Sequence, residues 1–298
     1  MDERDFPSFH PSSVSLHPWF PHVGFPLIPH PGSPGLRPIR SLKSVFGQWK
    51  CGPRTRGIPS PEIALIVPPR KTEPSIARFN ATTVRPVEAK EFVSAVQPAL
   101  VKQDWNGLIR TLKERWTPDE IVSLLHDPDA DARKVAALSI GLVGQSCALP
   151  ELARRLRDHD RMVIEMAEHA MWQIWFRGGC GEANKHLARG AELLNRQDIE
   201  KAIIHLNKAI ELSPEFAEAY NQRAIAYYML EHYAESIADC ERVVQMMPLH
   251  FGAWSGLGHC YLALGKLAEA LRAYEQAIAV NPHLDCIAEV VAELKQGA

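Results

Sequence analysis

The pattern of apolar residues along this 298-residue chain changes near Glu88. Before that point prolines interrupt the apolar stretches, and residues 1–90 hold 16 of the 23 prolines. Each proline removes a backbone donor and disfavours the helical conformation of the residue before it, so neither a long helix nor a central strand fits there. Beyond Glu88 apolar residues recur every three or four positions, which is the spacing of a helix face. We therefore expect residues 1–87 to be disordered and the rest of the chain to be all-α.

Residues 88–178 have the pattern of paired helices. The stretch 88–116 predicts one helical pair, and Thr117-Pro118-Asp119-Glu120 then supplies the hydroxyl, the proline and the glutamate that begin a helix. A shift of 31 residues lays this block on the next one, with Asp127 falling on Asp158. A fixed period that joins two helices through an aspartate-rich turn is typical of a solenoid.

The 31-residue units resemble HEAT repeats over residues 117–178. The resemblance is carried by Asp127-Pro128-Asp129, Ala136-Ala137 and Gly141. It implies two stacked helical hairpins. The second unit departs from the family's pattern because Ile164 stands where the first unit has Arg133, which puts the usual ladder of aspartate and arginine in question.

Three prolines, Pro214, Pro248 and Pro282, are 34 residues apart. Residues 251–284 carry Trp254, Leu257-Gly258, Tyr261, Gly265, Ala270, Tyr274 and Ala277 ahead of the last proline. This pattern resembles the tetratricopeptide repeat, whose period is 34 residues. The resemblance implies an α-solenoid of three hairpins, at 183–216, 217–250 and 251–284, and residues 285–298 then read as an amphipathic capping helix.

The first of these three hairpins is atypical. It has His186 and Arg189 where an aromatic residue and a leucine are usual. We expect the side chains of Trp172, Trp175 and Phe176, which precede it, to fill the space that these substitutions leave.

The resemblance also implies a concave groove lined by the first helices of successive repeats. The polar and aromatic candidates for binding a partner there are Asn184, Asn195, Glu218, Asn221, Tyr228, Ser255 and His259. Asn221 is the amide best placed to hydrogen-bond the backbone of a bound peptide. The alternative for Tyr228 and His259 is that they pack within or against a helix.

One specialised form of the family grips the acidic tail of heat-shock chaperones with lysine, arginine and asparagine at defined positions. Those positions here hold Leu187, Ala191, Gln222, Gly252 and Gly256. Four of the five cannot make the contact, so the sequence argues against a chaperone-tail adaptor of that type.

Charge and cysteine content limit the function classes further. The net charge of −2 divides into +6 over residues 1–90, from 12 Lys/Arg and 6 Asp/Glu, and −8 over the remainder. The six cysteines stand singly, without the paired spacing of a disulfide framework or a zinc site. There is no apolar run of the roughly 18 residues that a membrane helix needs, and no signal-peptide pattern. We expect a cytoplasmic protein without membrane insertion.

No constellation of nucleophile, base, phosphate loop or metal ligands stands out, so we predict no catalytic residue, cofactor or metal site. The aspartates of the turns are explained by helix capping. The favoured hypothesis is a non-enzymatic scaffold that binds a protein segment, a peptide or a helix, in the concave groove. The alternatives are a nucleic-acid-associated protein that uses the basic arm of residues 1–87 and a non-catalytic subunit of an enzyme complex.

Overall fold

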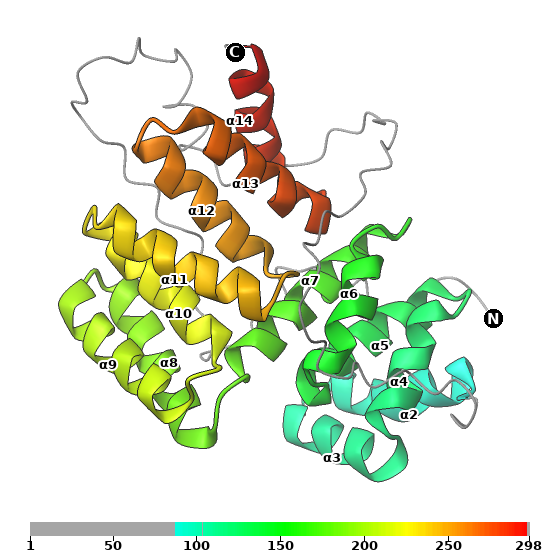
Figure 1. Ribbon diagram of the computed structural model, residues 1–298. Helices are drawn as coiled ribbons and strands as arrows, with labels where there is room; N and C mark the ends of the chain where they lie inside the picture. Colours follow the sequence, from blue (N-terminus) through cyan, green and yellow to red (C-terminus); the bar gives the residue numbers. More distant parts are fainter. Residues whose placement is uncertain (1–86, 103, 297–298) are drawn as a thin grey trace, which may run out of the picture.

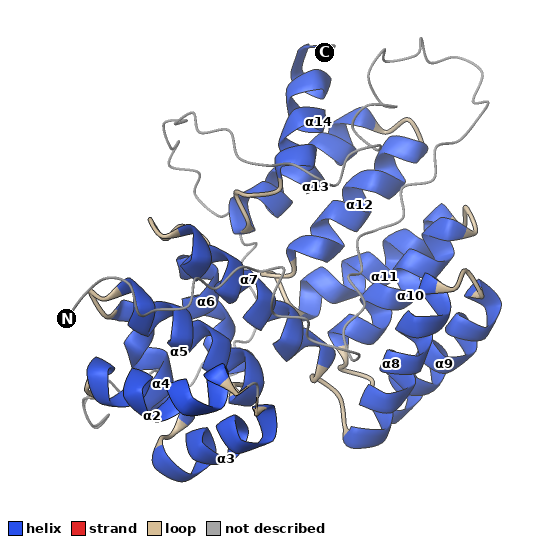
Figure 2. Cartoon of the chain, turned by 180° about the vertical axis from the view of Figure 1, so that it is seen from behind, coloured by secondary structure: helices blue, strands red, loops and turns tan. Residues whose placement is uncertain are grey.

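The computed structural model describes residues 87–102 and 104–296 (Figure 1). The predictions of a disordered segment and of a basic arm before Val87 lie outside these residues. Within them the chain folds entirely into helices and connecting turns, without a strand (Figure 2). The all-α prediction is confirmed.

The helices follow one another as hairpins and a final single helix. Their bounds are α2 (Ala89–Val101), α3 (Trp105–Arg115), α4 (Pro118–Ser123), α5 (Ala130–Val143), α6 (Leu149–Arg155), α7 (Arg161–Phe176), α8 (Gly181–Asn195), α9 (Ile199–Leu212), α10 (Ala217–Met229), α11 (Tyr233–Met246), α12 (Phe251–Ala263), α13 (Leu267–Val280) and α14 (Asp285–Gln296). Short 3-10 turns, Leu124–His126 and Ser146–Ala148, follow α4 and precede α6.

The start of α4 follows the predicted signal. The Thr117 side chain accepts a bond from the Glu120 backbone N–H, and the Glu120 carboxylate accepts one from the Thr117 N–H at 2.8 Å. This reciprocal capping satisfies donors that the first helical turn would leave unpaired. Asp129 and Asp160 cap α5 and α7 with the side chain alone, which accepts bonds from the backbone N–H groups of Asp131 and Met162.

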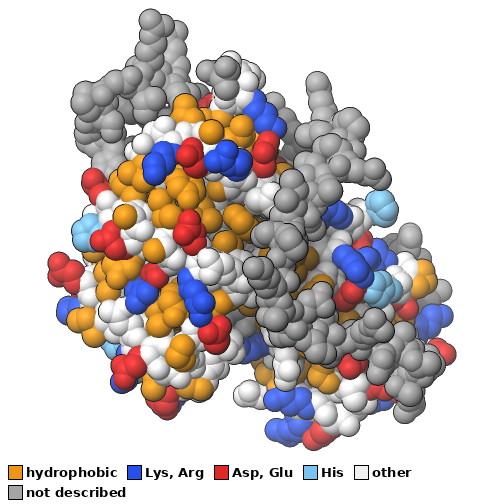
Figure 3. Space-filling model, in the orientation of Figure 1, with side chains coloured by type: hydrophobic (Ala, Val, Ile, Leu, Met, Phe, Trp, Pro, Cys, Tyr) orange, Lys and Arg blue, Asp and Glu red, His pale blue; other side chains and the backbone are white. Residues whose placement is uncertain are grey.

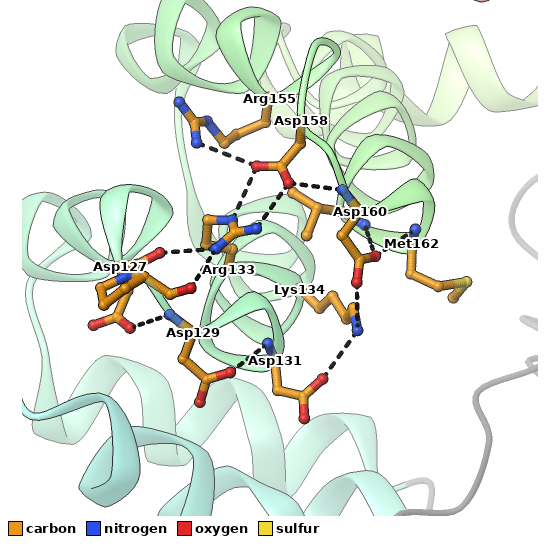
Figure 4. Close-up of polar contacts among 11 residues, drawn as sticks. Asp127, Asp129, Asp131, Arg133, Lys134, Arg155, Asp158, Asp160 and Met162 are labelled. Atoms are coloured by element: carbon orange, nitrogen blue, oxygen red, sulfur yellow. Dashed lines mark hydrogen bonds and ion pairs between the residues drawn. The ribbon is translucent and has the colours of Figure 1, made fainter.

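A network of charged side chains connects the turns before α5 and α7 (Figure 4). Arg133 donates to both carboxylate oxygens of Asp158, at 2.9 and 2.8 Å, and to the carbonyl of Asp127 at 2.9 Å. Lys134 links Asp131 to Asp160, at 3.0 Å each. The contact between arginine and aspartate that Ile164 put in question is therefore made between the units, from Arg133 of the first to Asp158 of the second.

The second and third hairpins each make the same contact with the hairpin before them. Tyr220 and Trp254 donate to the carbonyls of Pro214 and Pro248, six residues earlier in each case. A Cβ on Gly258 would lie 2.3 Å from the ring of Tyr274, so the glycine is needed for the close approach of α12 and α13.

The turns inside these three hairpins share an unusual backbone conformation. Gln197, Glu231 and Gly265 have φ angles of 61°, 63° and 72°. They are spaced by 34 residues, so each hairpin bends through the left-handed region at the same position.

Helix α14 covers the last open face of the array. Its buried Ile287, Val290, Val291 and Leu294 form one cluster with Tyr274 of α13. Helix α14 spans Asp285–Gln296 and buries one apolar face.

Helix α7 connects the two halves of the chain. Figure 1 shows it at the centre, between α2 to α6 on one side and the helices of the three hairpins on the other. The largest hydrophobic cluster contains Phe92 and Trp175 of the first half and also Phe251 and Val280 of the third hairpin. The two halves therefore share one core instead of forming separate domains.

Candidate functional site

The structure places five of the seven predicted groove residues in two groups. At the amino-terminal ends of α10 and α12, Glu218, Asn221 and Ser255 are buried. At the carboxyl-terminal ends of α8 and α10, Asn195 is exposed and Tyr228 is half-buried. The two remaining residues are half-buried: Asn184, which accepts a bond from the Gly179 N–H, and His259 on α12. We call the first group the proximal end of the groove and the second group, with Met229 and Leu262, the distal end.

The proximal end contains a buried polar cluster centred on Glu218. One carboxylate oxygen accepts from Asn221 at 3.1 Å and from Gln222 at 2.6 Å, and the other contacts His250 Nε2 at 2.8 Å. His250 Nδ1 accepts from the Ala253 backbone N–H at 3.1 Å. This acceptor role places the imidazole proton on Nε2, from which it is donated to Glu218.

Helix α7 lies on this end of the groove through its two indole rings. Trp175 stacks on His250 with ring centroids 4.1 Å apart. Trp172 meets Phe251 edge-on at 5.5 Å, and a Cβ on Gly252 would lie 2.9 Å from the Trp172 ring. A position that the resemblance assigns to the groove is thus filled by a side chain of the same protein.

Two polar contacts strengthen the junction away from the indoles. Arg157, after α6, donates to the carbonyl of Val280 at 3.3 Å and also to that of Ala279. The His283 ring contacts the carbonyl of Leu156 at 2.8 Å. These bonds join the turn before α7 to the end of the third hairpin.

Three polar atoms of Trp175 and of the buried polar cluster make no hydrogen bond among the described residues. Trp175 Nε1, Asn221 Oδ1 and Gln222 Oε1 are buried without a hydrogen-bond partner among the described residues. Each such atom costs about 1–3 kcal/mol, and burying each large aromatic side chain contributes about 1.5–3 kcal/mol.

The distal end presents uncharged side chains to solvent. The ring of Tyr228 lies 6.3 Å from that of His259 and 5.6 Å from that of Tyr233. Burial raises the pKa of Tyr228 to about 12, so its hydroxyl remains a donor at neutral pH. Burial lowers the pKa of His259 to about 4, and this neutral ring contacts the Tyr274 hydroxyl at 2.8 Å.

Apolar surface continues beyond the distal end. Leu264 and Leu267, in the turn between α12 and α13, are 44% and 43% exposed. Figure 3 shows hydrophobic side chains gathered over α12 and α13 on the face in view. This arrangement can recognise an apolar segment, with the Tyr228 hydroxyl and the Asn195 amide available for polar contacts.

The positions that would grip an acidic tail are unsuited to it in this structure as well. Leu187 and Ala191 are buried in the core of the first hairpin, and Gln222 is held by Glu218. Gly252 lies against Trp172, and Gly256 is buried. None of these five positions places a cation in the groove.

The other chemical candidates of the sequence have structural partners. The carboxylates of the aspartate-rich turns are engaged by backbone N–H groups and by Arg133 and Lys134, and the described residues include no cluster of three or more potential metal ligands. Cys180 is exposed at the start of α8, where a hydrogen bond with Ser213 and backbone N–H groups lower the pKa of its thiol. Across the part of the chain that is described, no helix is long and apolar enough to cross a membrane.

Sequence reasoning missed the destination of the α7 indoles. It placed Trp172 and Trp175 against the first hairpin, whereas they reach His250, the last residue of the second hairpin, and Phe251, the first residue of the third. Phe176 does pack against the first hairpin's cluster, as expected. The sequence did contain one signal that this surface is covered. Two ionisable residues, Glu218 and His250, stand at the otherwise mostly uncharged starts of two first helices.

Comparison with known proteins places the repeats in a family. Residues 190–231 match a model described as TPR repeat, and residues 217–250 and 252–284 each match a model described as tetratricopeptide repeat. The chain therefore carries tetratricopeptide repeats between residues 190 and 284. The preceding helices are not covered by these matches.

The curated relatives match over the same part of the chain. The Hsp70-Hsp90 organizing protein of Triticum aestivum is 30% identical over 116 residues, which are 39% of this chain and 20% of that protein. A TPR repeat-containing protein of Rhizobium etli is 29% identical over 108 residues, 36% and 53% of the two chains. Serine/threonine-protein phosphatase 5 of Homo sapiens is 30% identical over 106 residues, 36% and 21%. The chain thus spans between a fifth and about half of the length of these relatives.

Two solved structures are similar to different shares of this chain. The first TPR of Spaghetti (RPAP3) bound to an HSP90 peptide is 24% identical with a TM-score of 0.38, covering 39% of this chain and 92% of that chain. The crystal structure of MamA protein is 17% identical with a TM-score of 0.33, covering 64% and 90%.

Proposed function

We propose that this protein is a non-enzymatic scaffold that binds a segment of a partner protein on the concave face of its repeats. The observation that carries the proposal is the distal end of the groove. There Asn195, Tyr228 and Leu262 come from three successive first helices and remain accessible. Relatives named for organising other proteins support the same role.

The chemistry of the distal end favours an apolar partner segment. Its side chains are uncharged, and the Tyr228 hydroxyl stays protonated at neutral pH. Although the relatives include the Hsp70-Hsp90 organizing protein, the five positions that would hold an acidic tail carry no cation here. We therefore propose a partner other than the acidic tail of a heat-shock chaperone.

The first half of the chain serves this scaffold as a structural extension. We propose that residues 88–116 form a helical pair and that residues 117–178 are two HEAT-like repeats, on the basis of their Asp-rich turns and the contact between Arg133 and Asp158. Residues 183–284 then form the three tetratricopeptide repeats, and residues 285–298 hold the cap. A cytoplasmic location is proposed because the described cysteines, such as the exposed Cys147, are free thiols.

The proposal is tested by affinity capture with the full chain and two matched variants. Tyr228→Ala combined with Met229→Ser alters the distal end, whereas Ile204→Ser alters an apolar side chain on α9 that is 66% exposed. A partner that depends on the groove should be recovered at least about tenfold less with the first variant, equivalent to about 1.4 kcal/mol, and equally with the second. Equal recovery with both variants, at unchanged helical content, would contradict the proposed site.

A further inference from the structure

The proximal end of the groove already holds an occupant, which is a helix of the same chain. Helix α7 presents Trp172 and Trp175, three residues apart, to the first turn of α12. The indoles contact His250, Phe251 and the close-approach position Gly252. The groove is therefore shaped for a helix with two aromatic side chains on one face, and not only for an extended peptide.

This occupant leaves hydrogen-bonding capacity unused. Asn221 and Gln222 are at most 1% exposed, and the amide oxygen of each lacks a partner among the described residues. The indole N–H of Trp175, whose ring stacks on His250, is also without a hydrogen-bond partner among the described residues. A helix with a donor side chain beside its aromatic pair would satisfy groups that α7 does not.

The connection between α7 and the repeats is short and includes two glycines. Only residues 177–180 separate α7 from α8, and they include Gly178 and Gly179. Separation of the repeats from α7 would break the bonds of Arg157 and His283 and the contacts of the two indoles with His250 and Phe251, but it would leave α7 packed on α5. The proximal end can thus be uncovered without unfolding the first half.

We infer that the proximal end is a second binding surface, which takes an amphipathic helix bearing two aromatic residues three positions apart, in exchange with α7. The inference builds on the proposed scaffold function and names the class of partner for the covered part of the groove. In the absence of such a helix, α7 masks the surface. The partner gains the polar contacts with Asn221 and Gln222 that α7 lacks.

The test uses a fluorescein-labelled synthetic peptide with the sequence of residues 161–177 and the full chain. Wild type, whose own α7 competes, should bind the peptide at least tenfold more weakly than the variant with Trp172→Ala and Trp175→Ala. A peptide with both tryptophans replaced by alanine should not bind. Equal affinity of wild type and variant, or equal binding of the alanine peptide, would overturn the inference.

A second variant tests the inference independently, in case the tryptophan double variant does not fold. Arg157→Ala with His283→Ala removes the two polar ties and leaves the indole contacts and the groove intact, so peptide affinity should again rise at least tenfold. Arg154→Ala, at an exposed arginine of α6 that pairs within its own helix, is the matched control and should bind as wild type does. An unchanged affinity in the double variant contradicts the inference.

Failure of this inference is distinguishable from failure of the proposed function. Peptide binding should persist in Tyr228→Ala, whereas capture of a distal-end partner should be lost. Loss of peptide binding in Tyr228→Ala would show that the peptide occupies the distal end and would overturn the inference.

Discussion

The contact between Arg133 and Asp158 offers a quantitative test of how the turns of the first half are held together. We expect Arg133→Ala to lower the free energy of unfolding by about 3 kcal/mol. The side chains are only 13% and 3% exposed, and two of the arginine's bonds end on the carboxylate. The loss is limited because Asp158 keeps bonds from Arg155 and from the Asp160 N–H, at 3.2 and 3.0 Å.

The assay is urea denaturation followed by far-ultraviolet circular dichroism. Arg133→Lys retains the charge without the planar two-bond geometry, so it should lose about half as much stability as the alanine variant. A double-mutant cycle with Asp158→Asn should give a coupling of about 2 kcal/mol. A coupling below about 0.5 kcal/mol, the level of an exposed pair, would refute the claim that this pair connects the turns.

The same pair predicts a pH dependence. Burial alone would raise the pKa of Asp158, but the bonds from Arg133 and from the Asp160 N–H outweigh it and hold the pKa below its usual range. Because the folded pKa is the lower one, the stabilisation is complete above the unfolded pKa of about 3.9 and is lost as pH falls through the folded value. The difference between wild type and Arg133→Ala should therefore shrink below about pH 4.

Three further substitutions have defined outcomes. Gly258→Ala should cost about 2 kcal/mol in thermal or urea unfolding, because its Cβ would lie 2.3 Å from the buried Tyr274 ring; Gly181→Ala, where the Cβ meets nothing within 4 Å, is the control and should cost far less. Burial lowers the pKa of His259 to about 4, so the free energy of unfolding of wild type should fall by up to about 3 kcal/mol as pH falls from about 6.5 toward 4. In urea denaturation at a series of pH values, His259→Gln should show a smaller dependence on pH. Gln197→Gly should gain about 0.5 kcal/mol by relieving a φ of 61°, and a lowered urea midpoint would contradict this.

The hairpins were predictable because their signals are local. Thr117 and Glu120 determine the start of a helix by contacts within one turn, and the spacing of Pro214, Pro248 and Pro282 reports the hairpin length directly. Asn195 is exposed at the end of α8, and its contact with a partner stays a prediction.

The covered end of the groove was not predictable in the same way. Trp175 and His250 are 75 positions apart, and their contact depends on the curvature of the whole array and not on any local pattern. The resemblance to the tetratricopeptide repeat implied that Glu218 and Asn221 lie on the concave face. It contains no information about whether another part of the chain lies on that face.

The contacts of α7 with two different repeats also limit the number of repeats that this protein can have. In an open solenoid each repeat contacts only its neighbours, so copies can be gained or lost by duplication and deletion. Here the loop after α7 packs on Phe216, where the first repeat meets the second, while α7 itself packs on Phe251 at the start of the third. Insertion of one 34-residue unit between them would move Phe251 away from Trp175. The contacts of α7 therefore fit only one spacing between these two phenylalanines. A protein with an added or deleted repeat would also need different side chains in place of Trp172 and Trp175 on α7.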